Sequence, residues 1–162
     1  MASYAFVTEW QLEAPIERVY EAIHDSLSWP DWWPAVTKVE EIRPPTDRTG
    51  VGSVRRYTFK GKLPYTLSFD LTVDRIERPT TLGGTARGEL EGRGDWTLHE
   101  EDGVTCVRYD WTIRTTRWWM NLLAPLARGA FKSNHDYVMQ SGAKGICGLL
   151  GGVSGTCAWV SG

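Results

Sequence analysis

The chain has 162 residues, of which 41% are hydrophobic, and this is enough for one globular domain with its own core. The 18 basic and 20 acidic residues leave a formal net charge of -2, and the basic residues form no patch or stripe, so the composition argues against nucleic acid as the main partner. The first residues lack a basic region followed by a long apolar run, so we expect neither a signal peptide nor a stable membrane insertion.

The first part of the chain predicts one strand and two short helices. Apolar and polar residues alternate over residues 3–12, which is typical of a strand with one buried face. Pro15 then stands where a helix accepts proline, and apolar residues recur at helical spacing until about His24. Residues 29–34 are bounded by prolines and hold three tryptophans, so we expect a single turn whose indoles close one end of the core.

Residues 36–116 predict a series of strands with short connections. The candidate strands cover residues 36–43, 50–60, 65–73, 80–88 and 93–100, and a last one follows the turn at 101–103. The clearest alternation is at 65–73, where Leu67 and Phe69 share one face. Short connections between successive strands predict an antiparallel meander.

Residues 118–150 predict a long amphipathic helix with an apolar face that includes Phe131 and Val138. Pro125 would bend or break this helix near its start, so residues 118–124 are a candidate for a separate turn. Small residues such as Gly142 are expected to leave space beneath the helix. Residues 1–150 form the predicted single domain, and the Gly-rich tail at 151–162 is expected to fray.

These elements predict an α+β fold in which a curved antiparallel sheet of about seven strands wraps around the long C-terminal helix, because each then buries its apolar face. The three cysteines, Cys106, Cys147 and Cys157, are odd in number and form no CxxC pair. We therefore expect no disulfide framework, no zinc site and a reducing, cytoplasmic location. No other metal site or cofactor is expected, since no two histidines stand at metal-ligand spacing.

Two stretches resemble the opening of the START-like, or SRPBCC, superfamily in its polyketide cyclase/dehydrase branch: APIERVYEAI at residues 14–23 and WPDWW at residues 29–33. The resemblance extends over residues 3–150 and implies a helix-grip fold with a cavity between the curved sheet and the C-terminal helix. It also implies a relationship to aromatic polyketide cyclases, to carriers of lipids and quinones, and to plant hormone binders. Such a fold does not by itself fix the activity.

The inward positions of the strands and of the helix are the candidate ligand-binding residues. These are Arg55, Tyr57, Phe59, Tyr65, Leu67, Phe69, Trp96, Tyr109, Trp111, Phe131, Asn134 and His135. Such a wall suits a small-molecule pocket of roughly 300–1,000 Å³, and the alternative is that the side chains interdigitate and leave no cavity.

Three polar positions on this wall each allow two interpretations. Arg55 is an inward anchor for a carboxylate or carbonyl, or a strand bulge turns it into solvent. Asn134 binds a ligand, or it bonds to a strand or a tyrosine and holds the helix in register. His135, at the edge of the apolar stripe, is a packed side chain or a catalytic one.

The carboxylates Asp70, Asp74, Asp95 and Asp110 all take the outward parity, so the chain displays no catalytic set inside the fold. We therefore expect a monomer or homodimer that binds a small hydrophobic, aromatic or polyketide-like molecule, with polyketide cyclase or dehydratase activity as the enzymatic option. The alternatives are a non-catalytic lipid or quinone carrier, and a protein-interaction domain with a filled core that uses exposed tryptophans such as Trp32 and Trp118.

Overall fold

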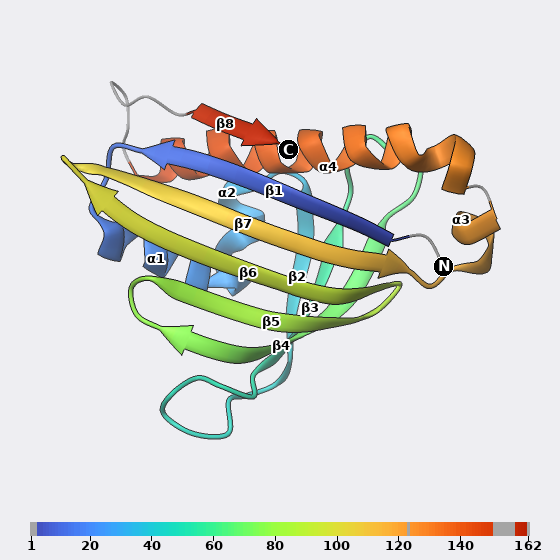
Figure 1. Ribbon diagram of the computed structural model, residues 1–162. Helices are drawn as coiled ribbons and strands as arrows, with labels where there is room; N and C mark the ends of the chain where they lie inside the picture. Colours follow the sequence, from blue (N-terminus) through green and yellow to red (C-terminus); the bar gives the residue numbers. More distant parts are fainter. Residues whose placement is uncertain (1–2, 123, 151–157, 162) are drawn as a thin grey trace.

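A curved antiparallel sheet of eight strands wraps around one long helix (Figure 1). The computed structural model describes residues 3–122, 124–150 and 158–161. Its elements are β1 (Ser3–Leu12), α1 (Ile16–His24), a 3₁₀ helix (Ser26–Ser28), α2 (Trp29–Trp32), β2 (Val36–Arg43), β3 (Val54–Phe59), β4 (Leu67–Glu77), β5 (Thr81–Gly88), β6 (Leu90–Glu101), β7 (Val104–Thr115), α3 (Trp118–Leu122), α4 (Ala124–Leu149) and β8 (Ala158–Ser161). The predicted helix-grip fold is confirmed.

The strand order β2-β3-β4-β5-β6-β7-β1-β8 is a meander with the first and last strands added at one side. β1 pairs with β7 from Ser3 opposite Arg114 to Leu12 opposite Thr105. Along β1 buried and exposed residues alternate, as the sequence predicts, and the buried members are Tyr4, Phe6, Thr8, Trp10 and Leu12. The buried face of the sheet is the wall of the core that faces α4.

The segment between β1 and β2 closes one end of the core, as its composition predicts. α1 begins directly after Pro15 and buries Val19, Tyr20 and Ile23. The three indoles that follow are buried, and the Trp33 indole donates a hydrogen bond of 2.8 Å to the Val138 carbonyl of α4. Trp32 is one of these three buried indoles, so the expectation that it is exposed for a protein partner is wrong. Trp118 on α3, the other tryptophan named for that role, is 74% exposed.

α3 ends at Leu122 and α4 begins at Ala124, with Pro125 as the second residue of α4, where a helix accepts proline; residue 123 lies outside the described residues. The expectation of space beneath Gly142 is wrong. A Cβ atom there would lie 2.6 Å from Cε2 of Trp33, because the glycine lets the helix lie directly on the indole. Here the small residue permits close packing and does not make a cavity.

The C-terminal tail differs from the expectation over four residues. Ala158–Ser161 form β8, which pairs antiparallel with β1 from Gln11 to Thr8, whereas residues 151–157 and 162 lie outside the described residues. The pairing occurs because β1 would otherwise be an edge strand with unpaired backbone N–H and C=O groups. The sequence predicts no disulfide framework, yet Cys147 on α4 is disulfide-bonded, while Cys106 has a free thiol. Within the ranges given above, no helix has the length and apolar character needed to cross a bilayer.

Candidate functional site

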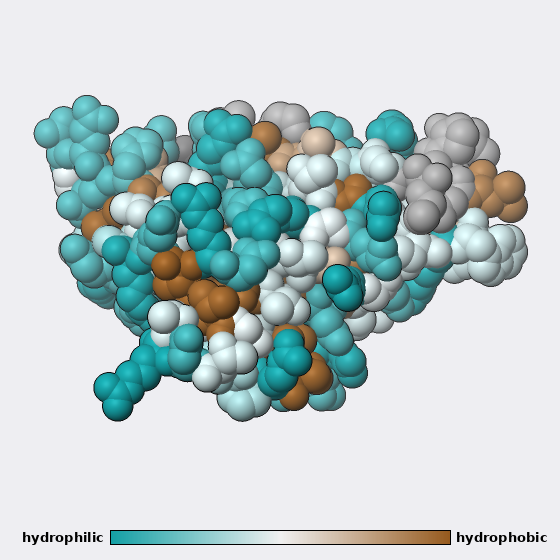
Figure 2. Space-filling model, turned by 60° about the horizontal axis from the view of Figure 1, so that its bottom comes forward, coloured by the Kyte–Doolittle hydropathy of each residue, from teal (hydrophilic) through white to brown (hydrophobic). Residues whose placement is uncertain are grey.

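A cavity of about 160 Å³ lies between the concave face of the sheet and α4. Side chains from β3 to β7, from the segment around α2 and from α4 line it. Figure 2 shows that hydrophobic residues gather in a recess on one face of the molecule, framed by hydrophilic ones. The volume is below the expected range of roughly 300–1,000 Å³, because the indoles of the α2 segment occupy one end of the space under α4.

The structure brings the predicted site residues together, with one exception. Those that line the cavity are Arg55, Tyr57, Phe59, Leu67, Phe69, Trp96, Tyr109, Trp111, Phe131, Asn134 and His135. Tyr65 does not line it. β4 begins at Leu67, so Tyr65 lies before the strand, outside its alternation, and packs edge-on against Trp119 at a ring distance of 5.0 Å.

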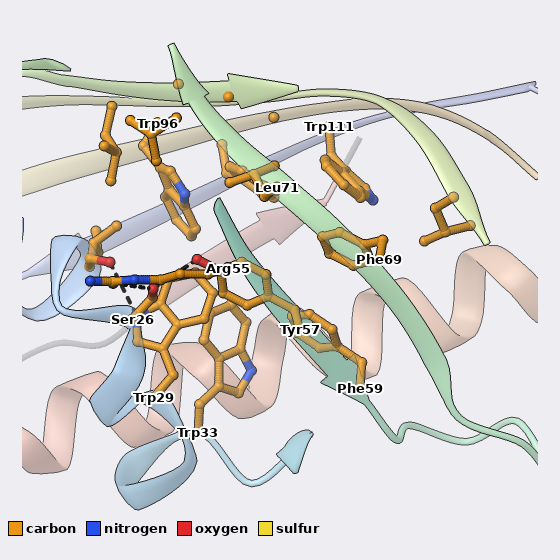
Figure 3. Close-up of a pocket in the computed structure, with 18 of the residues that line it drawn as sticks. Ser26, Trp29, Trp33, Arg55, Tyr57, Phe59, Phe69, Leu71, Trp96 and Trp111 are labelled. Atoms are coloured by element: carbon orange, nitrogen blue, oxygen red, sulfur yellow. Dashed lines mark hydrogen bonds between the residues drawn. The ribbon is translucent and has the colours of Figure 1, made fainter. Parts of the chain in front are cut away.

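Aromatic rings form two opposing sides of the cavity (Figure 3). Trp96 and Trp111 project from one side, and Trp29, Trp33 and Tyr57 project from the other. Trp96 stacks on Tyr109 with 4.0 Å between ring centroids. The result is a largely apolar space between flat surfaces, of the kind that accepts an aromatic molecule.

Several lining residues are not among those predicted from the sequence. Leu71 and Val73 line the cavity and share the parity of Leu67 and Phe69, so the alternation of β4 was a sufficient signal for them. Trp29 was assigned to the closed end of the core and also faces the cavity. Ser26 is the first residue of the 3₁₀ helix that leads into α2. A single serine between two predicted helices gives no sequence signal for a binding site.

A polar cluster forms at the end of the cavity nearest α1. Arg55 on β3 points inward, as one of the two interpretations expects, and its Nη1 donates to Ser26 Oγ at 2.7 Å and to the His24 carbonyl at 3.3 Å. The Tyr57 hydroxyl donates to the same Ser26 oxygen at 2.7 Å. Burial raises the pKa of Tyr57, against the opposing effects of Ser26 and Arg55, so this phenol is protonated at neutral pH.

Asn134 links α4 to the loop between β3 and β4. Its Oδ1 accepts backbone hydrogen bonds from Lys62 at 2.7 Å and from Leu63 at 3.3 Å. The interpretation that Asn134 holds the helix in register is therefore correct for its oxygen. Its amide nitrogen has no hydrogen-bond partner among the described residues, and the residue also lines the cavity.

His135 is buried on α4 and stacks on Phe6 of β1, with 4.1 Å between ring centroids. Neither of its ring nitrogens has a hydrogen-bond partner in the described part of the chain. Burial lowers the pKa of His135 to about 4, and the Asp136 carboxylate, 4.0 Å from Nδ1, offsets this only in part. The imidazole is neutral at pH 7 and is too weak a base to be matched to general-base chemistry at that pH.

Tyr109 offers a second phenol to the cavity. Burial raises its pKa well above the ordinary value, and Tyr57 and Asp95 add to the effect, so the hydroxyl is a hydrogen-bond donor at any physiological pH. This hydroxyl donates to no other group within the described residues, although the ring itself is stacked on Trp96.

The outward carboxylates form ion pairs on the convex face of the sheet. Asp70 pairs with Arg56 at 2.7 Å, Asp74 and Asp95 pair with Arg93 at 2.7 and 2.8 Å, and Asp110 pairs with Arg108. No Asp or Glu is among the described residues that line the cavity. In the described ranges, no group of three or more His, Cys, Asp or Glu is placed to hold a metal ion. The cavity thus offers hydrogen-bond donors and one cation, without an acidic group.

Comparison with known proteins gives the family. The family described as "Polyketide cyclase / dehydrase and lipid transport" matches residues 5–144. The chain belongs to this family. The matched range includes every strand that lines the cavity and most of α4, so the cavity belongs to the family's own domain. None of the curated proteins compared with the chain matches it significantly.

Solved structures share the fold of this family member at low sequence identity. The START superfamily protein from Mycobacterium smegmatis is 12% identical, with a TM-score of 0.72 over 93% of this chain and 99% of that one. The protein TTHA0849 from Thermus thermophilus is 18% identical, with a TM-score of 0.68 over 85% and 93%. The Zhui aromatase/cyclase from Streptomyces sp. R1128 is 14% identical, with a TM-score of 0.57 over 86% and 94%. At these identities the likeness establishes the fold alone.

Proposed function

We propose that the protein binds one compact, largely aromatic molecule in the cavity between the sheet and α4. The observation that carries this proposal is a cavity of about 160 Å³ between two sides of aromatic rings. An apolar protein cavity of roughly 150 Å³ is large enough to take up benzene. The volume therefore suits a ligand of one or two rings.

The size of the cavity also helps to choose between a compact ligand, a lipid or quinone, and a protein partner. A lipid or a quinone carries a long apolar tail, and sites for such larger ligands usually exceed roughly 300 Å³. A compact ligand fits the observed 160 Å³ better. A protein-interaction domain with a filled core would lack such a space, and it would also need Trp32 at the surface, where the residue is buried.

Cyclase or dehydratase activity is the finer proposal, and the family description names it beside lipid transport. Such a reaction would proceed mainly by positioning, because the lining groups are donors without a carboxylate base. The Tyr109 hydroxyl and the Arg55 guanidinium both face the cavity and would hold carbonyl oxygens of a bound poly-ketone. The test is turnover of a model poly-ketone by the wild type and by Tyr109→Phe; slower cyclisation at unchanged binding supports activity, and no acceleration over buffer argues for binding alone.

Binding itself is tested by filling the cavity. Leu71 projects into it from β4, so Leu71→Trp places an indole where the ligand would lie. Thr97→Trp is the matched control, because Thr97 is exposed beside Trp96 on the opposite face of β6. Calorimetric titration with one- and two-ring aromatic compounds should show saturable binding to the wild type and to Thr97→Trp, and none to Leu71→Trp. Equal binding by both tryptophan variants would place the ligand elsewhere.

A further inference from the structure

We infer that the ligand carries a carboxylate, which Arg55 and Ser26 hold at the α1 end of the cavity; this inference rests on the proposed function. It narrows the ligand class from compact aromatic molecules to aromatic carboxylic acids.

Arg55 uses only one side of its guanidinium within the described residues. Nη1 donates to Ser26 and to the His24 carbonyl, whereas Nε is buried without a hydrogen-bond partner and Nη2 makes no hydrogen bond. Nε–H and Nη2–H together form the edge of a guanidinium that donates two parallel hydrogen bonds to the oxygens of a carboxylate. The protein thus fixes the side chain through Nη1 and leaves Nε–H and Nη2–H without an acceptor among the described residues. Nε is covered, whereas Nη2 is not fully buried and is the group that an incoming carboxylate meets first.

Ser26 has a hydroxyl proton to donate. Its oxygen accepts from Arg55 Nη1 and from the Tyr57 hydroxyl, both at 2.7 Å, and these two bonds use both lone pairs. The remaining group of Ser26 is its O–H, which donates to no acceptor in the described part of the chain. A hydroxyl that accepts from a cation and from a phenol is polarised toward donating to an anion.

Arg55 also lacks the counter-ion that several arginines of the sheet have. Arg56, Arg93, Arg108 and Arg114 each contact a carboxylate at 3.0 Å or less. Arg55 has no carboxylate of the described residues within 4.0 Å, although Glu41 is its register partner on β2. A partly buried charge that is neither paired nor fully hydrogen-bonded costs free energy, and a bound anion would remove this cost.

The cluster stands at one end of the aromatic space. Figure 3 shows the Arg55 side chain extending toward Ser26 between Trp96 on one side and Trp29 on the other. A ligand ring that lies between the two aromatic sides would therefore direct a ring substituent at the guanidinium. A benzoate or naphthoate skeleton satisfies both requirements, whereas a neutral arene satisfies only the apolar one.

The test compares each acid with its amide at pH 7. The probes are benzoate with benzamide and 2-naphthoate with 2-naphthamide, titrated by calorimetry into the wild type, Arg55→Met and Arg55→Lys. Arg56→Met is the matched control, because Arg56 is the next residue and pairs with Asp70 on the outer face. Thermal melting of each variant confirms that it is folded.

The wild type and Arg56→Met should bind each acid more tightly than its amide by about 10- to 100-fold, the range for charge-assisted hydrogen bonds. Arg55→Met should lose this preference and keep the amide affinity within about 3-fold, and Arg55→Lys should recover only part of it, because an ammonium lacks the planar edge. Equal binding of acid and amide by the wild type, or an unchanged preference in Arg55→Met, overturns the inference and leaves the proposed function standing. Binding of no probe overturns the proposed function and the inference with it.

Discussion

Replacement of His135 by phenylalanine should make the protein more resistant to acid. His135 is buried with both ring nitrogens unpaired and with its ring on Phe6, so a phenyl ring would keep the stacking and remove the two polar atoms. At pH 7, where the imidazole is neutral, this removal should raise the free energy of unfolding by about 1–3 kcal/mol, the cost of unsatisfied buried groups.

The effect grows as the pH falls. The pKa of His135 is about 4 in the folded protein, below the ordinary value of 6.5, so the unfolded chain takes up this proton first. Above pH 6.5 the site contributes no pH dependence. Between pH 6.5 and 4 the wild type should lose about 1.4 kcal/mol per pH unit at this site, which is about 3 kcal/mol in all, and the loss should level off below pH 4.

Urea unfolding measured at several pH values between 7 and 4 tests this reasoning. His135→Phe should show a shallower decline of the unfolding free energy than the wild type, by about 3 kcal/mol over that range. His99→Phe is the control, because His99 is exposed on β6. Part of the slope should remain in every variant, since burial and Arg78 also lower the pKa of His24. Parallel declines in the wild type and His135→Phe would refute the account of His135.

The structure makes three other predictions. Asn134→Leu should lower the unfolding free energy by about 1–3 kcal/mol in chemical denaturation, because two loop N–H groups lose their acceptor; an unchanged midpoint would show that water replaces it. Gly142→Ala should lower the free energy of unfolding by about 1–3 kcal/mol, because the added methyl group overlaps Trp33. Gly129→Ala has nothing near its Cβ and should raise the free energy of unfolding by up to about 1 kcal/mol, so the two melting temperatures should move in opposite directions. Tyr65→Ala should leave the affinity for aromatic ligands unchanged in a calorimetric titration, because Tyr65 lies outside the cavity.

The fold could be predicted because local and global signals agree. The alternation of β1 and the helical spacing of α4 each identify a buried face, and short connections leave few ways to join those faces. The same parity identified most of the cavity wall, including Phe69 and Trp111. It failed at Tyr65, because alternation in the sequence continues beyond the point where strand pairing begins.

The remainder of the site depends on contacts between segments far apart in the sequence. Ser26 meets Arg55 and Tyr57 across about 30 residues, and no local pattern encodes this contact. The volume of the cavity depends on how closely α4 approaches Trp33. Gly142 permits this close approach, but a glycine in the sequence does not by itself predict it. The pairing of β8 with β1 likewise required the three-dimensional structure, because the tail has the composition of a loop.

A crystal structure of the protein grown with 2-naphthoate is the most direct test of the central claim that the cavity is a site for a compact aromatic ligand. We expect the two rings in the cavity between the concave face of the sheet and α4, with the carboxylate on Arg55 Nη2. Side chains packed into that space with no bound molecule, or a naphthoate bound only on the outer surface, would contradict the account.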